Sequence, residues 1–277
     1  MTRVAEAPPG FRRLRRGGCE LVVDAEIEEA AVAAGLLEPD AFERAFAARH
    51  GRGRAPTALL QLGAGGPRIH LRRLLHGGVL GPLLRGSFLG ARRPLAELHV
   101  TRVLHRGGVP VPRPALALAR RRAGPLRALA VGTWFEEGTV DAHDFLAAAP
   151  DTRRRLAAAA AAGRAVRRFH DAGGRHADLH VGNLLLRERP SGFECIVVDL
   201  DKARLGADPT PAERMAELMR LFRSLVKRGH LERVGARGCA RFLSAYCADD
   251  RRLRAALLRR LDPELRKVAL HRVGYRV

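Results

Sequence analysis

The stretch His176-Ala-Asp-Leu-His-Val-Gly-Asn183, followed by Ile196-Val-Val-Asp-Leu-Asp201, carries most of the information in this chain. It places an aspartate, an asparagine and a second pair of aspartates within 26 residues. The apolar run just before Asp199 predicts a buried strand that ends at a carboxylate. No other segment of this arginine- and alanine-rich sequence points to a reaction.

The order of these side chains suits phosphoryl transfer from ATP. In that reaction one carboxylate orients the attacking hydroxyl and accepts its proton, while an asparagine and a second aspartate hold magnesium. Magnesium prefers hard oxygen ligands and takes most of them from phosphate and water. Asp178, Asn183 and Asp199 supply this set in sequence order. The alternative is that these residues only cap turns, as Asp and Asn often do.

Composition bounds the class of protein. With 277 residues and 47% hydrophobic content, the chain fits a soluble globular protein of one two-lobed domain or two small domains. We expect no signal peptide and no membrane-spanning helix, because the apolar runs are too short. The four cysteines lack metal-binding spacing and are expected to be reduced thiols, so we expect a cytoplasmic protein.

The net charge of +21 predicts attraction to anions such as nucleotides or the face of an anionic membrane. A competing explanation is a GC-rich genome, because only Lys202, Lys227 and Lys267 are lysines among 50 basic residues. Aromatic residues make up 5% of the chain, and no nucleic-acid recognition motif is present, so we expect no specific nucleic-acid partner.

Apolar periodicity predicts a strand-rich first half and a helical second half, with a hinge near residues 134–140. After a loosely ordered arm over residues 1–20, the predicted strands cover 21–23, 57–62, 68–75, 116–119 and 126–135, and the predicted helices 26–37, 40–49 and 94–105. In the second half we predict strands at 184–186 and 194–198, and helices at 151–171, 211–228, 231–246, 251–261 and 263–272. The segment 77–90 is predicted to be a loop that faces a membrane or the acceptor, or that packs on the first half.

The motif His176-x-Asp178-x4-Asn183 with Asp199 resembles the catalytic loop and metal-binding triplet of the protein-kinase-like fold. More narrowly, residues 50 to 230 resemble the lipopolysaccharide kinase family, in particular its 3-deoxy-D-manno-octulosonic acid (Kdo) kinases. The segments that carry this resemblance are Arg72-Arg-Leu-Leu-His-Gly-Gly78, Gly107-Gly-Val-Pro-Val-Pro-Arg-Pro114 and Leu221-Phe-Arg-Ser-Leu-Val-Lys227.

The resemblance implies an α+β, two-lobed protein-kinase-like fold. Residues 1–49 would be an N-terminal extension packing on or preceding the N-lobe, residues 50–136 the strand-rich N-lobe, and residues 137–277 the helical C-lobe. It also implies that Asp178 is the catalytic base and that Asn183 and Asp199 hold Mg²⁺.

The resemblance further implies how ATP is held. Glu97 would pair with the basic residue that contacts the phosphates, which is Arg72 here where most kinases have lysine; arginine holds phosphate with a different geometry. Gly51 and Gly53 would form a short glycine-rich phosphate cover, although an ordinary turn explains them as well. Glu97 is alternatively an exposed helix residue, and only one of the neighbours Arg72 and Arg73 can face a cleft.

Two features argue against a protein substrate. Ala177 stands where protein kinases regulated by activation-loop phosphate carry arginine, and only residues 200–209 separate Asp199 from the next predicted helix. We therefore expect a sugar or glycolipid acceptor. The resemblance implies ATP- and Mg²⁺-dependent phosphorylation of a sugar hydroxyl of the lipopolysaccharide core, with peripheral contact to the anionic inner membrane.

Three other readings remain open at this point. An aminoglycoside- or choline-type phosphotransferase shares the loop motif and the short segment after Asp199. An atypical Ser/Thr kinase is another candidate. A non-catalytic pseudokinase would explain Arg72 and the short glycine loop, although intact Asp178, Asn183 and Asp199 weigh against it. Within the loop, His176 is expected to brace the backbone, and His180 to be a packing or surface residue.

Overall fold

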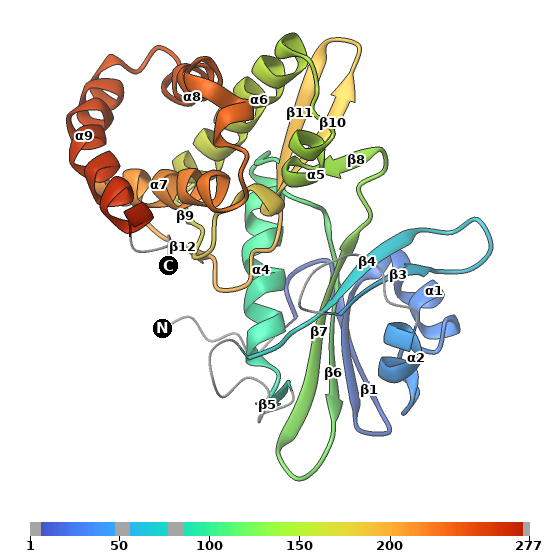
Figure 1. Cartoon of the computed structure of the whole chain (residues 1–277). Coiled ribbons are helices and arrows are strands. Elements are labelled where there is room, and N and C mark those ends of the chain that lie inside the picture. The colour runs from blue at the N-terminus through green and yellow to red at the C-terminus, as the bar shows by residue number, and fades with distance from the viewer. Residues whose placement is uncertain (1–6, 48–55, 77–85, 274–277) are drawn as a thin grey trace. The chain divides into compact units, whose positions relative to one another are not determined.

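The computed structural model describes residues 7–47, 56–76 and 86–273, and these form two compact units (Figure 1). The first unit comprises Met1–His105 and Pro112–Glu136. The second comprises Arg106–Val111 and Glu137–Val277. The first is built on a sheet and the second is mainly helical, which confirms the predicted α+β fold class.

The first unit contains one antiparallel sheet with strand order β1-β2-β6-β7-β4-β3, and β5 pairs with β7 beside it. The strands predicted over 57–62 and 68–75 form β3 and β4, which pair as a hairpin with Thr57 opposite Arg72. The strands are β1 (Phe11–Arg16), β2 (Cys19–Asp24), β3 (Thr57–Gln61), β4 (Arg68–Arg73), β5 (Ser87–Leu89), β6 (Pro114–Arg121) and β7 (Leu126–Trp134).

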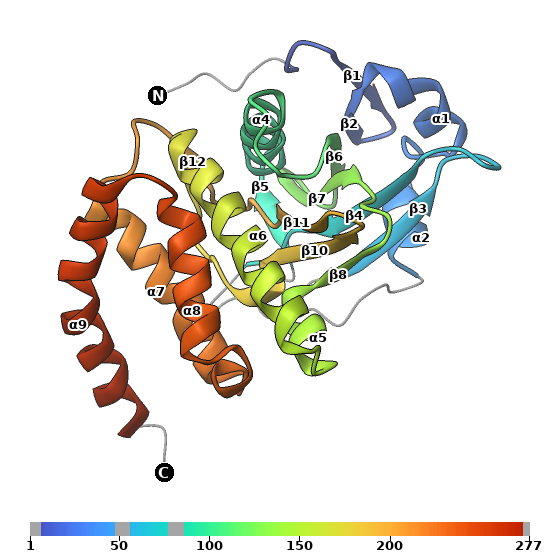
Figure 2. The same cartoon turned by 90° about the horizontal axis from the view of Figure 1, so that it is seen from above.

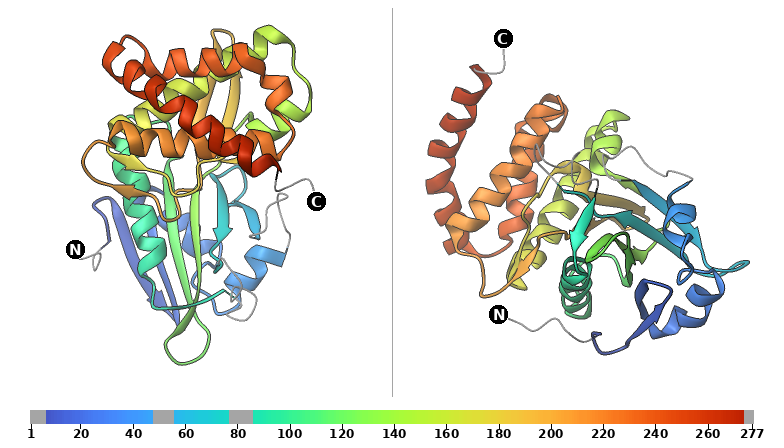
Figure 3. Two further views of the ribbon diagram at one scale, coloured as in Figure 1. Left: turned by 60° about the vertical axis from the view of Figure 1, so that its left-hand side comes forward. Right: turned by 90° about the horizontal axis from the view of Figure 1, so that it is seen from below.

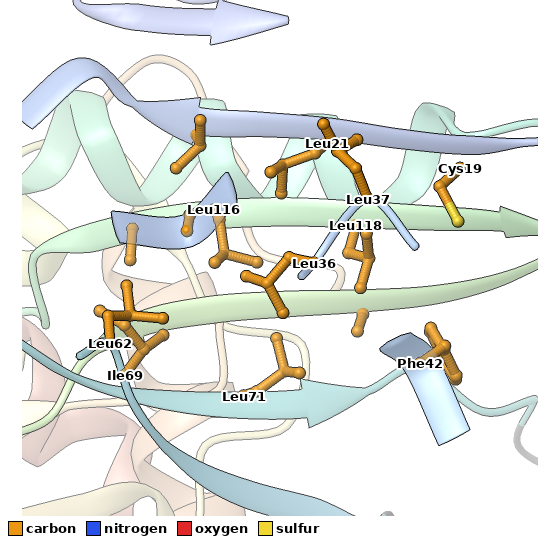
Figure 4. Packing of buried hydrophobic residues seen from close by; sticks show 14 of the residues in the cluster. Cys19, Leu21, Leu36, Leu37, Phe42, Leu62, Ile69, Leu71, Leu116 and Leu118 are labelled. Atoms are coloured by element: carbon orange, nitrogen blue, oxygen red, sulfur yellow. The ribbon is translucent and has the colours of Figure 1, made fainter. Parts of the chain in front are cut away.

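Both faces of this sheet are covered, because alternate residues of each strand point to opposite sides. On one face, Leu21, Leu71 and Leu116 pack against Ile27 and Phe42 (Figure 4). That side is covered by a 3-10 helix η1 (Ala25–Ile27), α1 (Glu28–Ala33) and α2 (Ala41–Ala47). On the other face, α4 (Arg92–Arg106) contributes Leu95 and Leu98, which pack against Val22 and Ala117.

Three predictions for the first unit were wrong in detail. Phe11–Arg16 form a strand rather than a loosely ordered arm, because the Gly17-Gly18 turn, with φ of +55° and +80°, folds them back onto β2. Ser87–Leu89 form β5 rather than loop, and residues 77–85 lie outside the described residues. The helix predicted over 26–37 is interrupted and ends early, at Ala33.

The second unit contains five α-helices among the described residues (Figure 2). They are α5 (Ala142–Ala147), α6 (Thr152–Asp171), α7 (Pro211–Lys227), α8 (Leu231–Cys247) and α9 (Arg251–Val273). A sheet of order β11-β10-β8 and a small β12-β9 pair accompany them. These strands are β8 (Thr139–Asp141), β9 (Gly174–Arg175), β10 (Leu184–Arg189), β11 (Gly192–Val197) and β12 (Arg204–Leu205), and a 3-10 helix η2 (Val181–Asn183) precedes β10.

The alanine-rich helix α6 has the predicted ends and packs closely on α8. The Asp151 carboxylate caps its start by accepting the Arg154 N–H at 2.9 Å, and Gly173, with φ +75°, lies just beyond its end. At Gly163 an added Cβ would lie 2.4 Å from the carbonyl oxygen of Phe242. The two backbones therefore approach at a distance that only glycine permits.

The prediction of two separate helices at 251–261 and 263–272 was wrong. Residues 251–273 form the single helix α9 with Pro263 inside it, rather than two helices divided at that proline. Proline removes one intrahelical hydrogen bond and favours a helix end, but good helix formers on both sides continue the helix here. α9 lies along α7 (Figure 3, orange to red). Across the described part of the chain, no helix combines the length and apolarity needed to cross a bilayer.

Candidate active site

In the first unit, the key feature is an ion pair between β4 and α4. Arg72 Nη2 lies 2.6 and 2.8 Å from the two carboxylate oxygens of Glu97. Both side chains are largely buried, with 16% of Arg72 and 7% of Glu97 exposed. Glu97 is therefore not an exposed helix residue, and the structure brings the two predicted residues together.

The neighbouring Arg73 faces the other side of the sheet. Its guanidinium lies over the ring of Phe42, 5.3 Å from the ring centroid, and burial lowers its pKa. The alternation of β4 thus directs Arg72 and not Arg73 towards Glu97. Gly51 and Gly53, the predicted phosphate cover, lie outside the described residues.

In the second unit, Asp178 and Asn183 lie on the loop that joins β9 to β10. The Asp178 carboxylate is 74% exposed, whereas Asn183 is buried. The Asn183 amide Nδ2 donates to the backbone oxygen of Asp178 at 2.9 Å, and the Asn183 carbonyl accepts the N–H of Val198 at 3.0 Å. This places the loop beside the end of β11, where Asp199 follows.

Asp199 adopts a left-handed backbone conformation with φ +59°. Such a conformation is uncommon for residues other than glycine, although aspartate tolerates it better than most. Backbone conformations of this kind cluster at functional sites, where the surrounding structure holds them in place. Asp199 is exposed and follows the buried end of a strand, as the sequence predicted.

His176 braces the loop, as expected. Its imidazole is fully buried, with Nδ1 accepting the Asp178 N–H at 3.1 Å and Nε2 lying 3.1 Å from the Val198 carbonyl. These two contacts require the proton on Nε2. Burial lowers the pKa of His176, so the neutral ring that these hydrogen bonds need is favoured.

A row of polar side chains on α7 holds the same loop. Glu217 accepts the backbone N–H of His176 at 2.9 Å. Arg220 donates to the His176 carbonyl at 3.0 Å, and the Ser224 hydroxyl accepts the Val181 N–H at 3.1 Å. Spacings of three and four residues put these side chains on one face of the helix.

The Glu217 carboxylate also connects the loop to a buried polar chain. Its Oε2 lies 3.2 Å from His170 Nε2, and His170 Nδ1 lies 2.6 Å from the Tyr246 hydroxyl. His170 and Tyr246 are fully buried, and burial raises the pKa of Tyr246 to about 12. α6, α7 and α8 are thus joined through hydrogen bonds that end at the catalytic loop.

His180 is a packing residue beside Asp178. Its Nε2 lies 3.9 Å from Asp178 Oδ2, and burial lowers its pKa. About a quarter of the side chain is exposed. The loop sequence by itself allowed either a packing or a surface position.

The available oxygen donors suit a magnesium ion shared with a nucleotide. Among the described residues, no group of three His, Cys, Asp or Glu side chains is arranged to hold a metal by itself. Mg²⁺ sites of nucleotide enzymes take one or two protein oxygens and complete their shell with phosphates and water. Since the Asn183 Nδ2 already donates within the loop, its Oδ1 and the Asp199 carboxylate are the oxygens that fit such an ion.

Sequence reasoning missed the role of α7. Glu217, Arg220 and Ser224 are ordinary polar residues in an amphipathic helix, and nothing local shows that they contact a loop some forty residues earlier. The available signal was the spacing of 217, 220 and 224 on one helical face. β8 and α5, which are only 3 and 6 residues long, were also missed.

An antiparallel sheet with an Arg–Glu pair, followed by a helical unit with an Asp–Asn loop and an aspartate after a strand, defines the protein-kinase-like fold. The chain belongs to the lipopolysaccharide kinase (Kdo/WaaP) family, whose model matches residues 47–246. The resemblance read from the sequence is thereby confirmed, and the protein is a kinase.

Relatives and a solved structure agree with this assignment. A 3-deoxy-D-manno-octulosonic acid kinase of Haemophilus influenzae (strain ATCC 51907 / DSM 11121 / KW20 / Rd) is 30% identical over 172 residues, covering 60% of this chain and 70% of the relative. One from Xanthomonas euvesicatoria pv. vesicatoria (strain 85-10) is 34% identical over 170 residues, covering 59% and 64%. The structure described as "WaaP in complex with acyl carrier protein" has TM-score 0.56 and 22% identity, and covers 88% of this chain and 98% of that one.

The hydrogen bonds to Glu217 predict a loss of turnover when its carboxylate is removed. Glu217→Ala leaves the His176 N–H and His170 without their acceptor, so we expect kcat to fall about 10- to 100-fold, equivalent to about 1.5–3 kcal/mol. The KM for ATP should change little, because the α7 contacts position the loop. Steady-state kinetics measure kcat and the KM for ATP, and thermal unfolding shows whether the variant is folded.

Glu232→Ala, an exposed glutamate on α8, is the matched control. Wild-type kcat in a folded Glu217→Ala protein would contradict the positioning role.

Proposed function

We propose that this kinase transfers the γ-phosphoryl group of ATP, in a Mg²⁺-dependent reaction, to a sugar hydroxyl of the lipopolysaccharide core. The observation that supports it best is the exposed Asp178 carboxylate on a loop fixed by His176, Asn183 and Glu217. Membership of the lipopolysaccharide kinase family supports the sugar acceptor. Kdo kinases among the relatives make Kdo-lipid A the first acceptor to test.

Asp178 is proposed to be the general base. Its backbone is held on both sides, by the His176 ring at its N–H and by the Asn183 amide at its carbonyl, while its carboxylate stays accessible. As the sugar oxygen bonds to the γ-phosphorus, the bond to the β–γ bridging oxygen breaks and the hydroxyl proton passes to Asp178. A fixed backbone with an accessible carboxylate orients the hydroxyl for this in-line attack.

Asn183 and Asp199 are proposed to hold Mg²⁺ through Oδ1 and the carboxylate. When bound, the ion would neutralise charge on the ATP phosphates. The Nδ2 hydrogen bond to Asp178 O fixes which end of the Asn183 amide remains for the metal. One residue thereby connects the catalytic loop to the proposed metal site.

Arg72 is proposed to contact the ATP phosphates, with Glu97 fixing its guanidinium in place. The pair lies at the end of a strand and on α4, with both side chains largely removed from water. A guanidinium offers several N–H donors, so it can keep its contact with Glu97 while donating to phosphate. Gly51 and Gly53 remain proposed as the phosphate cover.

Replacing the proposed base provides the first test. Asp178→Asn keeps the shape of the side chain but cannot accept the hydroxyl proton, so we expect kcat to fall about 100- to 10,000-fold. Magnesium-dependent ATP binding should persist within a few-fold. The assay uses labelled ATP with Kdo-lipid A, an aminoglycoside and a protein as separate acceptors, and Asp208→Asn, an exposed aspartate, as the control.

Each outcome of this assay distinguishes a competing function. Transfer only to the aminoglycoside would favour an aminoglycoside-type phosphotransferase over the lipopolysaccharide kinase. Transfer only to protein would favour an atypical Ser/Thr kinase. ATP binding without transfer to any acceptor would favour a pseudokinase. Wild-type turnover by Asp178→Asn would remove Asp178 from the base role.

The arginine at position 72 gives a second test. Arg72→Lys retains a cation opposite Glu97, so we expect the KM for ATP to rise less than about 10-fold, while Arg72→Ala raises it by more than that. Arg92→Ala, an exposed arginine on α4, should leave the KM for ATP unchanged. An Arg72→Ala protein with the wild-type KM would show that this guanidinium does not contact the nucleotide.

The acceptor suggests where the enzyme works. A lipid-linked acceptor would bring the protein to the cytoplasmic face of the inner membrane, and the net charge of +21 favours peripheral contact with anionic lipids there. We propose this location together with the acceptor, since each depends on the other.

A large apolar pocket in the second unit suggests an acyl ligand. Its volume is about 710 Å³, and α5 to α9 contribute lining side chains such as Phe145, Ala159, Met219, Phe222 and Leu257. Protein interiors are close-packed, and ligand pockets commonly have volumes of about 300–1,000 Å³. A structural neighbour is described as WaaP in complex with acyl carrier protein. We propose that an acyl chain occupies the pocket, carried by such a protein or by the lipid acceptor.

Filling the pocket tests this proposal. Ala159→Phe places a ring in space that is already present, so we expect a folded protein that loses co-purifying acyl chains, measured by mass spectrometry of organic extracts and by native mass spectrometry. Ala157→Phe, on α6 outside the pocket, is the matched control. Absence of acyl chains from the wild-type protein, or their retention by Ala159→Phe, would contradict an acyl ligand.

A further inference from the structure

The face of α7 that holds the catalytic loop continues to its C-terminal end. Ser224 contacts Val181 on the loop, and Arg228 follows four residues later, as the residue that caps the helix. Residues four apart lie on the same side of a helix. Arg228 therefore lies one turn beyond the contacts that hold the catalytic loop.

The guanidinium of Arg228 lies against that loop. A Cβ added at Gly182 would be 3.7 Å from Arg228 Nη2 and 3.4 Å from His180 Nδ1. The other ring nitrogen of His180 is 3.9 Å from the Asp178 carboxylate. His180 thus lies near both the proposed base and the arginine. Burial lowers the pKa of His180, and Arg228 is near enough to lower it further.

Arg228 carries a positive charge and is exposed. Within residues 7–47, 56–76 and 86–273, no carboxylate forms an ion pair with it. Some other exposed arginines of this unit do have such partners, as Arg154 has Glu188 and Arg189 has Glu194.

We propose that Arg228 is a specificity residue that binds an acidic group of the acceptor while Asp178 receives its hydroxyl. This inference rests on the proposed function, since it assigns a recognition contact to the same acceptor. A guanidinium binds a carboxylate or phosphate through two parallel hydrogen bonds, which fixes orientation as well as affinity. Because Arg228 and Asp178 both lie near His180, an acid group and a hydroxyl carried by one sugar or by adjoining sugars could reach the two side chains together.

A simpler role for Arg228 would be electrostatic. A cation at a helix C-terminus interacts favourably with the helix dipole by a few tenths of a kcal/mol to about 1 kcal/mol. That role predicts a small loss of stability and no effect that depends on the acceptor's charge. The two roles are therefore separated by changing the acceptor as well as the residue.

The test compares Arg228→Gln with wild type on three acceptors: Kdo-lipid A, the same molecule with the Kdo carboxylate converted to an amide, and the same molecule without its lipid A phosphates. We expect the KM for the intact acceptor to rise about 10- to 100-fold in Arg228→Gln, with the KM for ATP unchanged. When the bound acid group is removed from the acceptor, the KM of wild type should rise by the same factor. The KM of Arg228→Gln should not rise further. The analogue that shows this pattern identifies the group as carboxylate or phosphate.

Two controls accompany the comparison. Arg223→Gln removes an equal charge from an exposed position on the same helix and should leave the KM for the acceptor unchanged. Arg228→Lys should recover part of the affinity. Thermal unfolding of each variant separates a loss of acceptor binding from a loss of fold.

The outcomes keep the inference distinct from the proposed function. If wild type transfers phosphate to none of the three acceptors, the proposed function fails. Calorimetric binding of the methyl glycoside of Kdo and of its carboxamide to wild type and Arg228→Gln then decides whether Arg228 binds acid groups. Equal losses on charged and neutral acceptors, equal effects of Arg223→Gln, or unchanged binding would overturn the role of Arg228.

Discussion

In the helical unit of this kinase, the loop that carries Asp178 is anchored by one buried carboxylate. Glu217 accepts the backbone N–H of His176 and lies within hydrogen-bonding distance of His170, so it joins α7 to both the loop and α6. A buried carboxylate is costly unless it is hydrogen-bonded, and these two contacts supply that condition. The His176 ring in turn accepts the N–H of Asp178. Glu217 therefore positions the proposed base indirectly, by anchoring a residue two positions before it.

The first unit applies a simpler constraint, which is the alternation of side chains along β4. Leu71 is fully buried on the face covered by α1 and α2, so Arg72 must face α4, where it meets Glu97. The same rule directs Arg73 back towards Phe42. Two adjacent arginines with the same chemistry thus acquire different environments, and only Arg72 is paired with a buried carboxylate suited to holding a phosphate contact.

Packing among the helices of the second unit is uneven. Gly163 brings α6 and α8 into backbone contact, while Gly235, with φ +62°, breaks the regular geometry of α8. The apolar pocket lies among α5 to α9, lined in part by residues near that break. A close backbone contact at Gly163 and an apolar pocket within the same helical unit fit a protein proposed to act on a lipid-linked sugar.

The sequence by itself determined the fold class and the candidate residues, because the loop motif and the strand before Asp199 are local patterns. The family resemblance also implied that Glu97 would pair with Arg72, while the strand pattern left open which of Arg72 and Arg73 faces a cleft. Only the tertiary structure decided this choice, since it depends on which face of the sheet each helix covers. Likewise, the hydrogen bonds of α7 to the loop and the place of Arg228 near His180 join residues more than forty positions apart, and contacts at that separation leave no periodic signal in the chain.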